Sequence, residues 1–148
     1  MNVEIRQSSF DPLEELRRYQ AEQPSLKGQY GAIATFIGVM RDFNEGEGVS
    51  RMTLEHYPGM TERHLHHIVE DAKSRWGLLD ALVIHRVGAL YPDDPIVLVA
   101  VWTSHRAEAF EACRFIMEDL KSKAPFWKKE TLADGERWVE KNTAGYTS

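Results

Sequence analysis

Strand-like segments along this chain come in pairs, and a helical segment stands between one pair and the next. Alternating or β-branched apolar runs mark strands, whereas apolar residues that recur every three or four positions mark helices. Strands are predicted at residues 3–6, 31–41, 51–57, 81–91, 96–103, 126–131 and 137–140, and helices at 11–22, at 61–76 and from 104 to just before Pro125. Strands joined by short turns pair antiparallel. This order therefore predicts an α+β fold with mainly antiparallel sheet and three helices, similar to an α/β hammerhead.

Local signals define the ends of these helices. Asp11 is the predicted N-cap of the first helix, with Pro12 at its first position and Glu14 placed to close a capping box. Gly77 suits the position that follows the second helix. Ser104 is the predicted N-cap of the third helix.

Two turns have a length typical of hairpins. The polar segment 42–48 separates the strands that end at Arg41 and begin at Arg51, and residues 92–95 separate the next two strands. We therefore expect the strands of each pair to bond to one another. Residues 31–41 are apolar and β-branched, which predicts a largely buried strand.

Composition narrows the possible functions. The 148 residues suit one domain, residues 1–148, and a hydrophobic content of 43% is enough for a packed core. The net charge of −5 argues against a nucleic-acid partner, which needs a broad basic surface. The single cysteine, Cys113, lies on the apolar stripe of the third helix, which predicts a buried thiol. No signal peptide is recognised, and no apolar run is long enough for a membrane helix, so a soluble cytoplasmic protein is expected.

The segment LKSKAPFWKKE at residues 120–130 places four lysines around a proline and two large aromatic residues. Lys121 falls in the last helical turn and Lys128 on the following strand, and the reversal at Pro125 can bring them together. Phe126 shares a strand face with Lys128. Neighbouring ammonium groups lower each other's pKa, which makes a lysine a better nucleophile or acid. The alternative is structural, because such lysines also favour the helix dipole and protect an edge strand.

A second cationic cluster, Ser104-His105-Arg106, stands at the start of the third helix. Basic side chains there oppose the helix dipole, as in an anion site, although pairing with an acid such as Glu108 is an alternative. Arg106 and Lys121 are 15 residues apart on one helix, about 22 Å, which is too far for one small ligand. Either the chain has two sites, or a second subunit brings its His105 and Arg106 to Lys121 of the first.

Other polar residues give weaker signals. Arg41 has the guanidinium that suits carboxylates and phosphates, but alone it favours a surface position. His64, His66 and His67 have metal-like spacing, but the helix is otherwise amphipathic and a solvated face explains them better. His85 lies in an apolar strand, where a hydrogen-bonded structural histidine is expected.

Five segments between about residues 31 and 138 occur in a characteristic order. They are TFIGVMR at 35–41, LEHYPGM at 54–60, IHRVG at 84–88, SHRAEAF at 104–110 and the lysine segment at 121–130. Together they resemble the large, catalytic subunit of molybdopterin synthase.

This resemblance implies a reaction that composition does not reveal. The family converts cyclic pyranopterin monophosphate into molybdopterin by building its dithiolene, and so acts as a sulfurtransferase in molybdenum cofactor biosynthesis. Each sulfur arrives as a thiocarboxylate on the C-terminal glycine of a small ubiquitin-like partner subunit. Two large subunits form a homodimer with one small subunit at each end, a heterotetramer. No metal or other cofactor is implied for this step.

The resemblance also implies roles for individual residues. Lys121 and Lys128 match the family's active-site lysines; we assign the chemical step to Lys121, as acid–base group or transient nucleophile, and electrostatic holding to Lys128. The residues that match substrate-binding positions are Phe36, Arg41, His105, Arg106 and Met117. His105 and Arg106 are expected to come from the neighbouring subunit.

Two points stay open at this stage. The resemblance implies no residue role beyond Trp138, where the chain has Lys141 and Asn142. The alternative from a different functional class is a non-catalytic module that binds a partner's acidic C-terminal tail through the same lysines.

Overall fold

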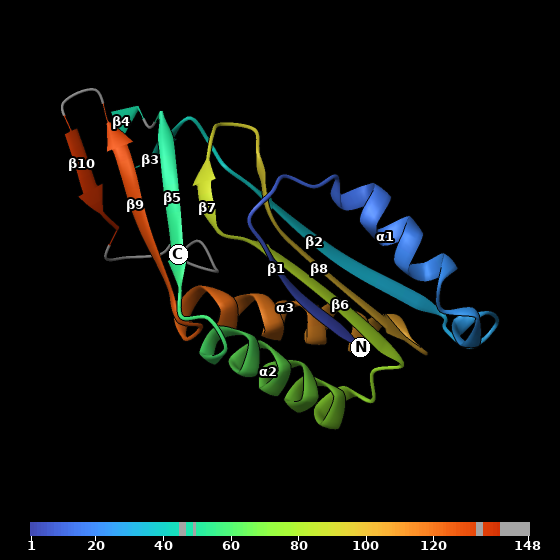
Figure 1. Cartoon of the computed structure of the whole chain (residues 1–148). Coiled ribbons are helices and arrows are strands. Elements are labelled where there is room, and N and C mark those ends of the chain that lie inside the picture. The colour runs from blue at the N-terminus through green and yellow to red at the C-terminus, as the bar shows by residue number, and fades with distance from the viewer. Residues whose placement is uncertain (45–46, 49, 133–134, 140–148) are drawn as a thin grey trace.

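A four-stranded sheet in the order β1-β6-β8-β2 forms the centre of the protein (Figure 1). The computed structural model describes residues 1–44, 47–48, 50–132 and 135–139. The strands of this sheet are β1 (Asn2–Arg6), β2 (Ala32–Val39), β6 (Asp80–Arg86) and β8 (Pro95–Thr103). β1 runs parallel to β6, whereas β6 and β2 both run antiparallel to β8.

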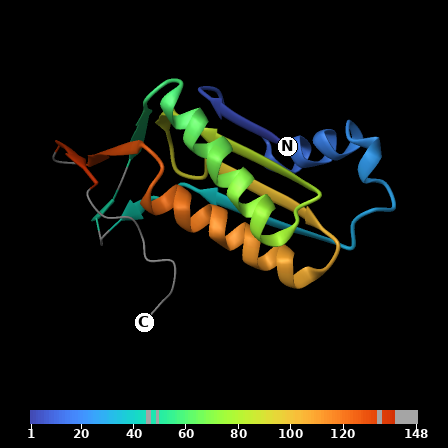
Figure 2. The same cartoon turned by 90° about the horizontal axis from the view of Figure 1, so that it is seen from below.

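Helices cover both faces of this sheet. α2 (Met60–Trp76) and α3 (Arg106–Ser122) lie side by side on one face, as Figure 2 shows from below. α1 (Pro12–Ala21) covers the other face and is followed by the short helix η1 (Pro24–Leu26). Within the described residues, no helix combines the length and the apolar character that a membrane crossing requires.

Two apolar clusters hold these layers together. The larger one lies between the sheet and the helices α2 and α3, where Leu65, Val99 and Ile116 are almost completely buried. The smaller one lies under α1 and centres on Trp102, whose ring is 5.6 Å from that of Tyr19. Full burial of such a side chain contributes roughly 1.5–3 kcal/mol, so these clusters fix α2, α3 and the sheet as one scaffold.

A second sheet, in the order β10-β9-β5-β7, stands where α3 ends and α2 begins (Figure 1). Its antiparallel strands are β5 (Arg51–His56), β7 (Gly88–Leu90), β9 (Phe126–Leu132) and β10 (Gly135–Trp138). A separate two-stranded ladder pairs β3 (Phe43–Asn44) with β4 (Glu47–Gly48). The predicted α+β class, with mainly antiparallel sheet and three α-helices in the described part of the chain, is confirmed.

The predicted helix ends are mostly confirmed. The carboxylate of Asp11 accepts hydrogen bonds from the backbone N–H groups at the start of α1, and Gly77 is the C-cap of α2. Two details are wrong. Glu14 does not close a capping box but binds the guanidinium of Arg17, and the N-cap of α3 is His105 rather than Ser104.

The predicted pairing of the strands on either side of residues 42–48 is wrong. β2 bonds to β8 in the first sheet, whereas β5 bonds to β7 and β9 in the second. Backbone bonds from Met40 N to Asp94 O and from Asp93 N to Met40 O, both 2.9 Å, hold the end of β2 to the turn before β8. The segment predicted as a loop carries β3 and β4 instead.

The single strand predicted at residues 81–91 is divided between the two sheets. β6 pairs with β8 as expected, but the chain turns at Gly88, whose φ of 88° suits glycine alone, and β7 then pairs with β5. Residues 126–132 and 135–138 form the predicted last hairpin. Glu140, the expected end of its second strand, lies outside the described residues.

β2 is not the largely buried strand that its apolar sequence predicts. Ile33, Phe36 and Val39 are 39%, 40% and 47% exposed. The reason is its place at the edge of the sheet, where it has β8 on one side only.

Gly31 packs against the link between β8 and α3, and this contact gives a test of the fold. A Cβ atom at Gly31 would lie 2.2 Å from the carbonyl oxygen of Ser104, whereas one at Gly48 would meet nothing within 4 Å. Gly31→Ala is expected to lower the free energy of unfolding by about 1–3 kcal/mol, measured by urea denaturation. Gly48→Ala serves as the control. Equal stability of the two variants would contradict the close contact.

Candidate functional site

Two lysines meet in a cavity of about 430 Å³ at the junction of α3 and the second sheet. Lys121 lies in the last turn of α3 and Lys128 is the third residue of β9. Their side-chain nitrogens share a hydrogen bond. The structure therefore brings the two lysines together, as the reversal at Pro125 predicts.

The turn between the lysines is held by buried hydrogen bonds. Thr61, which exposes none of its surface, donates its hydroxyl to the carbonyl of Pro125 at 3.1 Å and accepts from the backbone N–H of Tyr57 at 3.1 Å. The carbonyl of Asp119 accepts the backbone N–H groups of Lys123 and Ala124. Pro125 is thus tied to the start of α2, and the residues before it are tied to the last turn of α3.

Aromatic residues form much of the cavity wall. Phe126 stacks on the imidazole of His85, with ring centroids 4.0 Å apart and planes at 15°. Trp127 meets the ring of Tyr57 edge-on at 4.5 Å. The remaining wall is largely apolar; the other lining residues are Leu54, Ile96, Leu120, Ser122, Ala124, Trp138 and Val139. Such a cavity suits a flat ligand with an anionic group.

Burial lowers the pKa of both lysines below the ordinary value of 10.5. For Lys128, the charge of Lys121 and their hydrogen bond lower the pKa further, to about 8, although Glu130 acts in the opposite direction. Glu130 is itself buried and accepts a hydrogen bond from Arg137 at 3.0 Å. Each ammonium of the pair therefore gives up its proton more easily than an ordinary lysine does.

The second cationic cluster lies at the other end of α3. His105 and Arg106 are exposed, and neither lines the lysine cavity. Among the described residues, neither of them forms a salt bridge with Glu108, and the buried Oε2 atom of Glu108 has no hydrogen-bond partner there. The hydroxyl of Thr103 donates to the carbonyl of His105 at 2.6 Å and holds the start of the helix. These two side chains are left facing solvent at a helix N-terminus.

The other substrate-binding candidates also lie outside the cavity. Arg41 is exposed just after β2, and Phe36 is 40% exposed on that edge strand. Met117 is buried in the core under α3. The structure of one chain thus brings Lys121 and Lys128 together in the cavity, whereas these predicted residues do not line it, although Met117 lies one helical turn before Lys121 on α3.

Two predictions for single residues can be compared with the structure. His66 and His67 are exposed, as a solvated face predicts, whereas His64 is only partly exposed and forms a 2.7 Å bond with the buried carboxylate of Asp119. Cys113 is buried, and burial raises its pKa to about 11, which confirms the predicted buried thiol.

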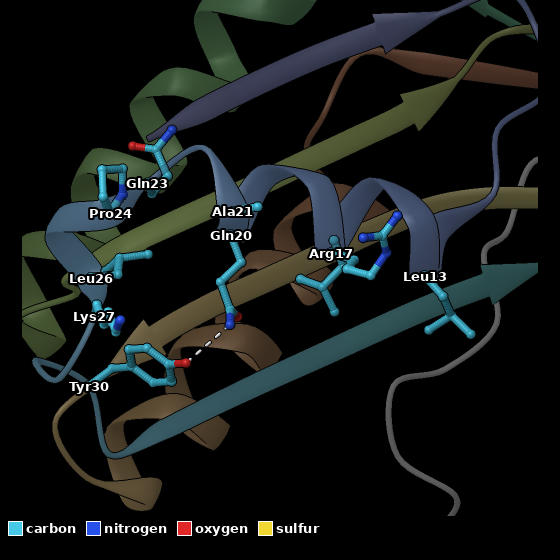
Figure 3. Close-up of a pocket in the computed structure, with 10 residues that line it drawn as sticks. Leu13, Arg17, Gln20, Ala21, Gln23, Pro24, Leu26, Lys27 and Tyr30 are labelled. Atoms are coloured by element: carbon cyan, nitrogen blue, oxygen red, sulfur yellow. Dashed lines mark hydrogen bonds between the residues drawn. The ribbon is translucent and has the colours of Figure 1, made fainter.

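A second cavity, of about 560 Å³, lies far from these lysines, between α1, η1 and the start of β2. Figure 3 shows Leu13, Pro24 and Leu26 around it, with the amide of Gln20 donating to the hydroxyl of Tyr30 at 3.1 Å. It contains no pair of ionisable groups with shifted pKa values, so the smaller lysine cavity is the better candidate for chemistry.

Sequence reasoning missed two residues that shape the site. His85 is the buried, hydrogen-bonded histidine that its apolar strand predicts, but its place in the cavity wall was not predicted, and Thr61 gave no signal at all. A single titratable residue near the end of an apolar strand was the available sign for His85.

Comparison with known proteins shows the family of this chain. The sequence model of one protein family, described as "MoaE protein", matches residues 5–123. This chain belongs to the MoaE protein family. The resemblance noted from the sequence is confirmed.

Relatives of this chain include molybdopterin synthase catalytic subunits. The chain is 57% identical over 138 residues to the molybdopterin synthase catalytic subunit of Ralstonia nicotianae, covering 93% of this chain and 76% of the relative. It is 48% identical over 140 residues to the molybdopterin synthase catalytic subunit of Pseudomonas aeruginosa, covering 95% of this chain and 91% of the relative.

Solved structures show the same fold. The MoaE protein of Burkholderia ambifaria matches with a TM-score of 0.77 and 47% identity, over 93% of this chain and 88% of that chain. The molybdopterin synthase structure from Staphylococcus aureus matches with a TM-score of 0.82 and 30% identity, over 94% of this chain and 98% of that chain.

The paired lysines make a prediction about titration. Lys121→Met removes a neighbouring charge, so the pKa of Lys128 is expected to rise from about 8 while staying below 10.5, because burial persists. NMR titration of ¹⁵N-labelled lysine side chains measures this. Lys123→Met, which changes an exposed lysine two residues further on, is the control. An unchanged Lys128 titration in the Lys121 variant would contradict the pairing.

Proposed function

We propose that this chain is the catalytic subunit of a molybdopterin synthase and that it works in the cytoplasm. It would transfer sulfur from the thiocarboxylate at the C-terminal glycine of a small ubiquitin-like partner to cyclic pyranopterin monophosphate, which forms the dithiolene. The observation that carries this proposal is the pair of half-buried lysines in a cavity of a MoaE family member. The names of its relatives support the same activity.

The lysine pair has the chemistry that this transfer needs. When the sulfur leaves the glycine carbonyl, water supplies the oxygen that restores a carboxylate, so protons must be moved at the reacting carbon. Lys121 would perform this step, either as the acid–base group or as a transient nucleophile towards the carbonyl. Lys128 would hold the anionic substrate or the thiocarboxylate. Lowered pKa values suit both roles near neutral pH.

The substrate phosphate and pterin would be held by residues from two subunits. Arg41 of one subunit, together with His105 and Arg106 of its neighbour, would bind the anionic group, and Phe36 and Met117 would belong to the apolar wall. Two observations support a shared site. His105 and Arg106 lie at the far end of α3 from Lys121, and they face solvent without a salt bridge among the described residues.

An exposed apolar surface supports the homodimer that this requires. Ile33, Phe36 and Val39 are exposed on the edge strand β2, and Phe110 is 69% exposed on α3, which packs against β2. Surfaces of this kind usually meet a partner. A two-fold contact between two large subunits would cover both copies and leave each lysine cavity for one small subunit.

Activity of single variants tests the chemical role. With thiocarboxylated partner and precursor, Lys121→Ala is expected to form almost no molybdopterin, because the proton-carrying amine is lost. Product mass is the measurement, and Lys123→Ala is the control. Near-normal turnover would remove Lys121 from the mechanism, and tail binding without product in the unaltered chain would favour a non-catalytic binding module.

Mixed dimers test the shared site. Lys121→Ala and Arg106→Ala chains, each inactive alone, are unfolded and refolded together in equal amounts. If Arg106 acts across the interface, half of the dimers hold one intact site, and activity should return to about a quarter of the wild-type value. Activity that stays at the level of the single variants would place both residues in one subunit.

A further inference from the structure

His85 is a cavity residue that the proposed mechanism does not use. It is the next-to-last residue of β6 and only 6% exposed, and its side chain reaches the lysine cavity. Its ring stacks on Phe126, two residues before Lys128 on the same strand face. The imidazole therefore lies between the central sheet and the strand that carries one of the lysines.

The hydrogen bond of His85 fixes which nitrogen carries the proton. Nδ1 lies 2.8 Å from the carbonyl oxygen of Arg86, and a carbonyl only accepts, so Nδ1 must be the N–H donor. In the neutral ring, Nε2 then holds a lone pair that can accept a hydrogen bond.

The surroundings keep this ring neutral. Burial is the main cause that lowers the pKa of His85 to about 3, and the charges of Lys121 on α3, Lys128 on β9 and His56 on β5 lower it as well. The ring therefore cannot serve as the base that takes a proton near neutral pH. It remains a hydrogen-bond acceptor throughout the physiological range.

Acceptors are scarce in this cavity. Apart from the lysines, the lining side chains are apolar or aromatic except for His85 and Ser122. The tryptophan N–H groups only donate, and the hydroxyl of Ser122 is exposed and bonded to the carbonyl of Glu118. An ammonium has three N–H donors, so when the lysine pair takes up a proton, Nε2 of His85 is a buried side-chain acceptor that the lining offers.

We propose that His85 is a positioning residue whose Nε2 accepts a hydrogen bond from the ammonium of the lysine pair. It acts through the lysines and not on the substrate. By stabilising the protonated pair, it holds the ammonium against the cavity wall while sulfur is transferred. The inference rests on the proposed function for the role of the lysine pair.

Two polar variants separate this role from simple packing. Gln in place of His85 puts an amide oxygen near the position of Nε2, whereas Asn reaches only the position of Nδ1 and can keep the bond to Arg86. We expect His85→Asn to lower kcat by about tenfold with little change in KM for the precursor, and His85→Gln to stay within about threefold of wild type. If packing and the Arg86 bond are what matters, Asn will be at least as active as Gln, and the proposal is overturned.

A second readout does not depend on turnover. In lysine NMR titrations, the pKa of Lys128 should be lower in the Asn variant than in the Gln variant, because only Gln supplies an acceptor for the ammonium. Equal values overturn the inference. Different values in a protein that makes no molybdopterin would overturn the proposed function and leave the role of His85 standing.

The wild-type ring gives a third readout if a variant fails to fold. The ¹⁵N shifts of His85 should show a neutral ring with the proton on Nδ1 from pH 5 to pH 9. A proton on Nε2 leaves no lone pair for the lysines and is sufficient by itself to reject the proposal.

Discussion

The hydroxyl of Thr61 joins the two turns on which the lysine cavity depends. It donates to Pro125, between α3 and β9, and accepts from Tyr57, between β5 and α2. Since Thr61 is completely buried, its loss would leave two backbone groups without partners, at a cost of roughly 1–3 kcal/mol each. Lys121 lies on the helix before this turn, and Lys128 lies on the strand after it. Their meeting is therefore set by rigid elements and not by a loop.

Charges around the cavity are arranged so that both amines keep low pKa values in an acidic protein. The net charge is −5, and yet the buried carboxylate that favours the charged form of Lys128, that of Glu130, is bound by Arg137. A carboxylate that pairs with a guanidinium stabilises an ammonium less than a lone one would. The neutral imidazole of His85 adds an acceptor without adding negative charge. The cavity thus tolerates a proton on the pair without holding it tightly.

Sequence reasoning succeeded where the physical cause is local. The cap at Asp11, the end of α2 at Gly77 and the meeting of Lys121 with Lys128 all follow from residues close together in the chain. It failed where strands pair with partners far away in the sequence, because the length of a turn does not determine which sheet each flanking strand joins. The separation of β2 from β5 is of this kind. His85 was assigned a structural role because its closeness to both lysines depends on how β6 meets β9, which no local pattern encodes.

The buried thiol of Cys113 has a consequence for chemical selectivity. It is the single cysteine of the chain, and it lies eight residues before Lys121 on α3, about 12 Å along the helix. With its pKa at about 11, only roughly one thiol in a thousand or fewer is a thiolate near neutral pH. A thiolate beside an acyl–sulfur bond would exchange with it and capture the donor as a thioester. The nucleophilic side chains of the candidate site are the two lysine amines, so the site offers no thiolate that would compete for the sulfur.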